Sequence, residues 1–598
     1  MHSPRAGRWH DATRIVFTDG AGRRRSPAFC RARMAGTKRR IVLAFGDEVV
    51  LMHVAGNRSH TLVSLVTAIA LVAGLGITAA TAEAAARRDA PLLAAVKAAD
   101  FDTVRSLVGR GVDVDQTAPD GATALHWAVH RNDAGLVDLL LEAGADVSVK
   151  NRYGVQPISL AAENGSADIL EALLEAGADP NAALPEGETV LMTAARTGNA
   201  AAIRVLLVRG ADPNLRDSFR GQTALMWAAA RNNADAVHAL AELGADVGAK
   251  TETVERPPNG NRLFYAPPPT GFTALLFAAR SGHIDAVQVL LAAGADVNDT
   301  LSDGQSALVV AVANANWELA DYLLDRGADP NLAGAGWGAL HQLVRTRRMN
   351  TGFGFPGPIP SGSVDSIDVL RKMIAVGGDV NARMTVNGMK DGQRNRLNRL
   401  GATPFFLAAK VTDTEAMRVL LDAGADPTIP SADGTTPLMV ASGVAIWNPG
   451  EDGGSLPGQE DEVLEAVKLC LEHGNDINAA NYRGMTALHG AAFRGANNVA
   501  EHLVEQGADL DARTELGYSP LAIADGFSYS DFYKAQKHTA ALLRQIMEER
   551  GIPTDGEGHA IPGTLCFDCL QTRRDQIEQR VAWEAELEVD FKAQLTGK

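Results

Sequence analysis

Apolar and polar residues recur along this chain in a fixed order, with a period of about 33 residues. One unit begins at Gly121 and is written GATALHWAVHRNDAGLVDLLLEAGADVSVKNRY, and the next begins at Gly154. Further units begin at Gly187, Gly221, Gly271, Gly304, Gly336, Gly401, Gly434, Gly484 and Gly517. A less regular unit precedes them from about residue 90. A period of this length is typical of a repeat array rather than of several globular domains.

Each unit contains the pattern of two short helices. Thr123 stands at a helix N-cap position, where its hydroxyl can accept from free backbone N–H groups, and Ala124 and Ala128 give the first helix small packing residues. The apolar spacing of residues 136–143 predicts a second helix. Gly144 ends that helix, because glycine tolerates a left-handed conformation. One unit cannot bury its own apolar face, so the units must stack into a shared core.

The pattern resembles that of the ankyrin repeat family. The helix start, the Ala-Ala pair and the Gly-Ala-Asp turn of that family occur here as Thr486-Ala487-Leu488-His489, Ala491-Ala492 and Gly507-Ala508-Asp509. Eleven or twelve such units cover residues 90–550. The resemblance implies an all-α solenoid of stacked helix-turn-helix units with β-hairpin fingers and a concave groove. It also implies a structural role, at turns and helix starts, for His126, His283, His341 and His489.

Four insertions interrupt the array, at residues 251–270, 350–364, 385–400 and 447–461. The first and third lengthen two fingers, whereas the other two separate the helices of one unit. Insertions in a solenoid form loops on one face, which is often the binding face. Surface elaboration without a function is the alternative, because long loops cost little closure entropy.

A basic column follows the Ala-Ala pair of successive units, at the exposed end of each first helix. Its members are Arg131, Arg196, Arg231, Arg280, Arg345, Lys410 and Arg494. In the ankyrin family this column lines the groove, where positive charge would attract an acidic segment of a partner protein. The alternative is structural, because the helix dipole favours cations near a helix C-terminus.

The finger tips supply a second set of candidate partner-binding residues. These are Arg152, Tyr153, Phe219, Arg220, Tyr482 and Arg483. Three further rings, those of Trp127, Trp227 and Phe277, precede the basic column. Such rings serve either as binding hot spots or as packing residues, and we favour packing.

Charge is unevenly distributed in this chain of 598 residues and net charge −16. Residues 1–60 form a basic leader, with 12 Lys and Arg against 4 Asp and Glu, and show no clear helical or strand period. We infer that translation starts at Met34 or Met52, so that the basic leader is not part of the natural product. The acidity of the rest argues against a general nucleic-acid-binding protein.

An apolar segment follows the leader. Residues 61–84 end in a small-residue site, Ala82-Glu83-Ala84, which is typical of a cleaved signal peptide. The segment is also long enough for an uncleaved membrane anchor. A disordered leader is a third interpretation. The signal peptide predicts an exported protein, periplasmic or secreted, that meets a membrane only if the segment remains as an anchor.

Candidate chemistry is confined to the tail, residues 551–598. Cys566 and Cys569 form a Cys-x-x-Cys pair that can close a disulfide, hold a metal or exchange thiols. We favour a local disulfide, since a zinc site needs two more ligands and only His559 is near. Residues 571–595 predict a helix that either caps the last repeats, as we expect, or binds a partner.

The sequence predicts no catalysis and no cofactor. It contains no phosphate-binding loop, nucleophile elbow or zinc-protease helix. We therefore expect a monomeric scaffold or adaptor that binds another protein through the groove and the finger tips. The alternative is an array that displays a Cys-x-x-Cys tail for redox chemistry or metal binding.

Overall fold

The structure is a computed structural model of two units, Met1–Ala90 and Pro91–Lys598. It describes residues 40–45, 48–53, 90–252, 270–348, 358–388, 397–445, 460–515, 517–526, 535–554, 586–587 and 589–595. The predicted signal segment at 61–84 lies outside these residues, as do Cys566 and Cys569 and most of the four insertions. Among the helices that are described, none combines the length and the apolar character needed to cross a bilayer.

The described part of the first unit is a two-stranded antiparallel hairpin. Strand β1 (Arg40–Phe45) pairs with β2 (Glu48–His53), and the register places Phe45 opposite Glu48. The sequence analysis found no clear strand period in the basic leader, and this hairpin lies within it. The sequence did carry a local signal for a β-hairpin. Two apolar runs flank Gly46-Asp47, a dipeptide typical of hairpin turns.

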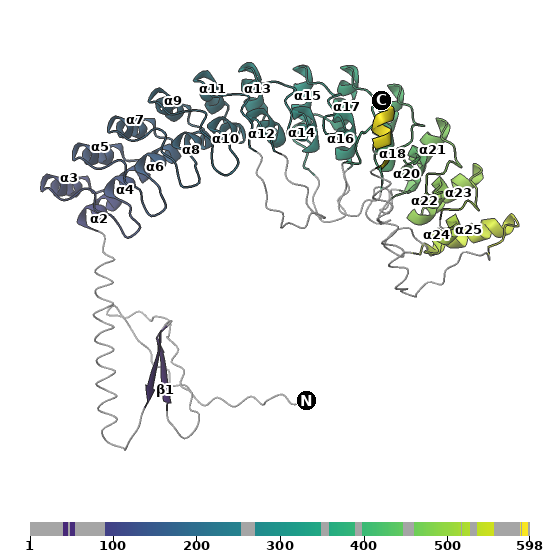
Figure 1. Cartoon of the computed structure of the whole chain (residues 1–598), viewed down its shortest axis with the longest axis horizontal. Helices are drawn as coiled ribbons and strands as arrows, with labels where there is room; N and C mark the ends of the chain where they lie inside the picture. Colours follow the sequence, from purple (N-terminus) through teal and green to yellow (C-terminus); the bar gives the residue numbers. More distant parts are fainter. Residues whose placement is uncertain are drawn as a thin grey trace. The chain divides into compact units, whose positions relative to one another are not determined.

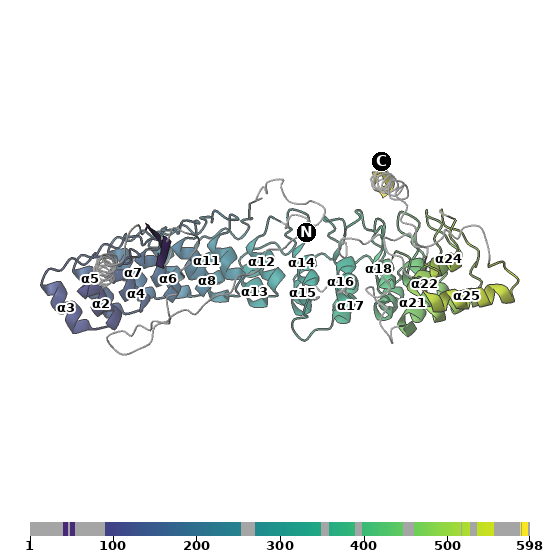
Figure 2. The same ribbon diagram turned by 90° about the horizontal axis from the view of Figure 1, so that it is seen from below.

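The second unit contains twelve helix pairs among the described residues, arranged in two rows (Figures 1 and 2). The first helices are α2 (Pro91–Ala98), α4 (Ala124–His130), α6 (Pro157–Asn164), α8 (Val190–Thr197), α10 (Ala224–Ala229), α12 (Ala274–Ser281), α14 (Ala307–Ala313), α16 (Ala339–Arg347), α18 (Pro404–Lys410), α20 (Pro437–Ser442), α22 (Ala487–Arg494) and α24 (Pro520–Ala524). The second helices are α3 (Phe101–Gly109), α5 (Ala134–Glu142), α7 (Ala167–Glu175), α9 (Ala200–Val208), α11 (Ala234–Glu242), α13 (Ile284–Ala292), α15 (Trp317–Asp325), α17 (Ser366–Ala375), α19 (Thr414–Asp422), α21 (Glu460–Glu472), α23 (Asn497–Glu505) and α25 (Lys537–Glu549). Each helix packs against its partner and against the same helix of the neighbouring repeat.

The fold confirms the predicted all-α solenoid of helix-turn-helix units. Its core is built from small aliphatic side chains such as Ala128, Leu136 and Leu140, which are fully buried. The fingers are turns rather than paired strands. Within the described residues, isolated antiparallel bridges occur in two fingers, at Ala183–Thr189 and Thr300–Ser306.

Backbone hydrogen bonds join each finger to the one before it. The N–H of Arg152 donates to the carbonyl of Asp120 at 2.8 Å, and that of Glu252 donates to the carbonyl of Arg220 at 3.0 Å. The same bond joins Tyr482 to Asp433 at 3.1 Å. Because the donor and the acceptor lie about one repeat apart, these bonds fix the stacking of neighbouring units.

Asparagine side chains form a second connection between repeats. The Asn181 amide donates to the carbonyl of Gly210 at 3.2 Å, while its oxygen accepts from the N–H of Asp212 at 2.8 Å. One side chain thus supplies the donor and the acceptor that a neighbouring strand would offer. The residues that make both bonds, here called the asparagine ladder, are Asn181, Asn214, Asn331, Asn381 and Asn478.

The N-cap residue of the second helix makes a third connection, which runs back to the end of the preceding first helix. Asn199 Nδ2 donates to the carbonyl of Gly165 at 2.6 Å, and Asn316 Nδ2 donates to that of Ala279 at 3.1 Å. Carbonyls at a helix end lack partners within the helix, so these amides satisfy them.

Histidines join the start of a first helix to the next finger. In His489, Nδ1 accepts from the backbone N–H of Thr486 at 3.1 Å, so Nε2 carries the proton and donates to the carbonyl of Tyr518 at 3.0 Å. His126 and His341 make corresponding contacts, whereas His283 Nδ1 donates to the carbonyl of Ala229. The structural role that the family resemblance implies for these histidines is confirmed.

The tail does not end the array as expected. The last repeat is the pair α24 and α25, and α25 also packs on α23. The described helical residues of the tail, 589–595, instead place Phe591 against Arg383, in the finger that precedes α18. The described residues of the tail therefore do not cap the last repeat, and residues 571–585 of the predicted helix lie outside the described part of the chain.

Acidification should destabilise the array through its buried histidines. Burial lowers the pKa of His341 and of His489 to about 4, whereas an unfolded imidazole titrates near about 6.5. Between these values the unfolded chain binds more protons, so stability falls as pH falls, by about 2 kcal/mol per histidine at pH 5. We expect the urea midpoint to drop between pH 7 and pH 5, and to drop less in His489→Gln. An equal drop in the variant would contradict this assignment.

Because two fingers lie in close contact, we expect alanine to destabilise the array far more at one glycine than at another. Gly304 and Gly294 both have positive φ, 85° and 94°, so alanine is strained at either position. A Cβ on Gly304 would also lie 2.4 Å from the carbonyl carbon of Gly334, whereas one on Gly294 would meet nothing within 4 Å. We expect Gly294→Ala to cost about 1 kcal/mol and Gly304→Ala clearly more. Urea unfolding of the two variants measures the difference, and equal losses would refute the role of the finger contact.

Candidate functional site

The basic column divides into two parts with different surroundings. Arg131, Arg231 and Arg280 are exposed at or just beyond the ends of α4, α10 and α12, and Arg196 is partly exposed on α8. Arg131 donates to the backbone carbonyl of Lys97, and Arg196 lies 3.7 Å from Glu188. These four residues are here called the open column.

The other three column residues are not open. Lys410 is 4% exposed and Arg494 is 6% exposed, while Arg345 is half-buried. The prediction that Lys410 and Arg494 face a partner is therefore wrong. Arg494 is covered because Gly443 and Gly490 let the end of α20 lie close against α22. A Cβ on Gly443 would lie 2.7 Å from the carbonyl oxygen of Gly490 and 3.1 Å from the Arg494 Cβ.

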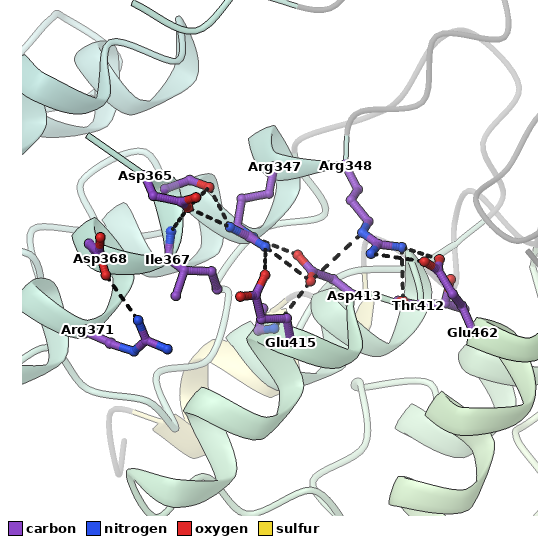
Figure 3. A network of polar contacts seen from close by, with 12 residues as sticks. Arg347, Arg348, Asp365, Ile367, Asp368, Arg371, Thr412, Asp413, Glu415 and Glu462 are labelled. Atoms are coloured by element: carbon purple, nitrogen blue, oxygen red, sulfur yellow. Dashed lines mark hydrogen bonds and ion pairs between the residues drawn. The ribbon is translucent and has the colours of Figure 1, made fainter. Parts of the chain in front are cut away.

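Beyond Arg345, two further arginines form an internal polar network (Figure 3). Arg347 Nε donates to Asp413 at 2.8 Å, and Arg347 Nη2 donates to the exposed Glu415 at 2.9 Å. Arg348 lies between Asp413 and Glu462, so the network links α16, α19 and α21. In this part of the chain, basic residues hold repeats together and leave fewer charges for a partner.

The network has a simple chemical cause. Asp413 is the N-cap of α19 and accepts from the N–H of Ala416, the position that Asn199 and Asn316 hold in other repeats. A carboxylate cannot donate to the preceding carbonyls as an amide does. Asp413 instead pairs with the cation of Arg347, which balances a carboxylate that has no exposed surface.

Removing the buried carboxylate should be far more costly than removing the exposed one. Asp413→Asn leaves Arg347 without its buried partner, and we expect a loss of about 3 kcal/mol. Glu415→Gln is the matched control, because it removes an exposed partner of the same arginine and should cost less than about 1 kcal/mol. Chemical denaturation of both variants tests this expectation. Comparable losses would show that the buried contact has no special weight.

The predicted finger-tip residues lie on exposed turns and form stacked pairs. Tyr153, Phe219 and Tyr482 are exposed, and each carries the guanidinium of its sequence neighbour at 5.0 to 5.3 Å from the ring centroid. Arg152 also donates to the Tyr153 hydroxyl at 2.8 Å. Each of these tips thus presents a ring and a cation side by side.

Aromatic rings also support one member of the open column. The Arg280 guanidinium lies 5.1 Å from the ring of Phe272 and 5.2 Å from that of Phe277. Burial and the charge of nearby Arg220 lower the pKa of Arg280. Among the described residues, no carboxylate forms an ion pair with Arg280 or Arg231. Arg220 and Arg280, one on a finger tip and one in the column, thus form a local excess of positive charge.

Of the three rings before the column, Phe277 is a packing residue, as expected. It is buried and its ring lies 4.9 Å from that of Phe272. Trp127 and Trp227 are only partly buried. Trp127 holds the ammonium of Lys97 at 4.4 Å from its ring.

The described residues offer no metal site built from three or more His, Cys, Asp or Glu side chains. Cys470 on α21 is buried, and burial raises the pKa of its thiol. It is a core residue.

The sequence analysis missed the asparagine ladder and Asp413. A recurrent Asn two residues after the Gly-Ala-Asp turn was visible in the sequence.

Comparison with known protein families agrees with this architecture. A model described as ankyrin repeats (3 copies) matches residues 92–183, 158–251 and 258–333, and one described as ankyrin repeats (many copies) matches residues 471–524. The chain belongs to the ankyrin repeat family.

The ankyrin array is similar to parts of several known proteins. The B-cell lymphoma 3 protein homolog of Mus musculus is 30% identical over 145 residues, which is 24% of this chain and 29% of that protein. NF-kappa-B inhibitor alpha of Rattus norvegicus is 33% identical over 121 residues, 20% of this chain and 34% of that protein. The human ASB11 ankyrin repeat domain matches with 25% identity and a TM-score of 0.34, over 40% of this chain and all of that domain. The matches span about a third or less of the two full-length relatives.

Proposed function

We propose that this ankyrin array is a non-catalytic scaffold that holds an acidic segment of another protein on the open column and the finger tips. The observation that carries the proposal is the pair Arg231 and Arg280, two exposed cations that form no ion pair among the described residues. They leave charge available for a ligand.

Electrostatics favours an acidic ligand at this end of the array. Arg196, Arg231 and Arg280 follow one another on α8, α10 and α12, so an extended segment could meet them in turn. Arg280 is already ordered by Phe272 and Phe277, which lowers the entropy that it would lose on binding.

The relatives support binding of a protein ligand in general. One of them, NF-kappa-B inhibitor alpha, is named for its action on NF-kappa-B. Nothing in the described residues favours the alternative of redox or metal chemistry, because Cys566 and Cys569 lie outside them. Export to the periplasm or the medium, and a monomeric state, stay predictions from the sequence.

Charge reversal in the open column tests the proposal. We expect Arg231→Glu/Arg280→Glu to weaken binding of a fluorescent oligoglutamate peptide about tenfold or more, since two attractive contacts become repulsive. The same variant should lose proteins that the unmodified chain captures from its native extract. Fluorescence anisotropy and quantitative mass spectrometry measure the two effects.

A control separates this local effect from net charge. Lys468→Glu reverses an exposed charge on α21, in the row of second helices, and should leave both measurements unchanged. If the double variant and the control bind alike, the open column is not the binding site.

A further inference from the structure

A socket for an aromatic side chain lies across the finger that joins α17 to α18. Arg383 begins this finger and Gly401 ends it. The Arg383 guanidinium donates through Nε to the carbonyl of Gly401 at 3.0 Å and through Nη2 to that of Pro430, in the next finger, at 2.8 Å. Two carbonyls from two fingers therefore hold the planar cation in one orientation, with a face free for a ring.

The ring in this socket comes from the tail of the same chain. Phe591 lies with its ring centroid 4.6 Å from the Arg383 guanidinium and is 6% exposed. A Cβ on Gly401 would lie 3.0 Å from Cζ of Phe591, so the absence of a side chain at Gly401 makes room for the ring. The same Cβ would lie 2.7 Å from Nη2 of Arg383, so the bare backbone of Gly401 leaves room for both the ring and the cation.

Phe591 is the one apolar residue that is buried in the described part of this helix. Val589 and Leu595 are 68% and 46% exposed, in contrast to Phe591. Figures 1 and 2 both place the C-terminal helix at the level of α18 along the array, far from α25. A single ring over one guanidinium is a small contact, so a reversible attachment is expected.

We propose that Arg383 and Gly401 form an aromatic-binding site whose ligand is the chain's own C-terminal helix, inserted through Phe591. The C-terminal helix thereby contacts the array at the finger before α18, and release of Phe591 frees that helix.

Hydrogen–deuterium exchange on the full chain tests the attachment. Phe591→Ala removes the ring without touching the array, and we expect faster exchange in peptides that cover residues 586–595 and 397–402. Leu595→Ala, at an exposed position of the same helix, is the matched control and should exchange as the unmodified protein does. Unchanged exchange in Phe591→Ala would overturn the proposal.

A binding experiment tests the socket itself. A fluorescent peptide of residues 586–598 should bind the full-length Phe591→Ala protein, whose socket is empty, at least tenfold more tightly than the unmodified protein. Arg383→Met in the Phe591→Ala background should abolish that binding, with retention of the fold checked by circular dichroism. Equal binding to all three proteins would overturn the proposal.

Light scattering shows whether the ring of Phe591 comes from the same chain or from a second copy. A monomer that keeps slow exchange at Phe591 supports insertion within one chain. A dimer that dissociates on Phe591→Ala would overturn the intramolecular assignment and would give the socket to the tail of a second copy.

Discussion

Hydrogen bonds between neighbouring repeats are the interaction on which this structure depends. Each repeat is two short helices and a turn, too small to bury its own apolar residues or to satisfy its own helix ends. Finger backbones, asparagine amides such as Asn181, N-cap amides such as Asn316 and histidines such as His489 all reach across to the adjacent repeat. The apolar core supplies most of the driving force, and these bonds define the spacing at which the repeats meet.

The same constraint explains where basic residues are available and where they are not. Where the second helix begins with an amide, the preceding carbonyls are satisfied and the nearby arginine is free to face outward, as with Arg280 before Asn316. Where it begins with Asp413, arginine is needed inside the array. One change of N-cap residue therefore alters the surface of the repeat before it.

The sequence was sufficient for the repeat period, the helix pairs and the caps, because these depend on contacts within about 30 residues. It predicted exposed finger tips at Tyr153 and Phe219 for the same reason. The burial of Lys410 and Arg494 could not be inferred, since the cover over Arg494 arises from the approach of Gly443 to Gly490 between two repeats. The position of Phe591 depends on a contact some 200 residues away in sequence, for which the chain carries no local signal.

The asparagine ladder is not continuous, and its gaps divide the array. Ser148, Gly248 and Thr428 stand at positions where Asn181 or Asn214 would bridge two repeats. The hydroxyls of Ser148 and Thr428 donate within their own turns, to Asp146 and Asp426, and Gly248 has no side chain. In a linear solenoid the stability of each junction is nearly independent of distant ones. The array is therefore a chain of stiffer blocks joined by weaker seams. Mechanical load or thermal fraying should open it at those seams, block by block, before any single helix melts.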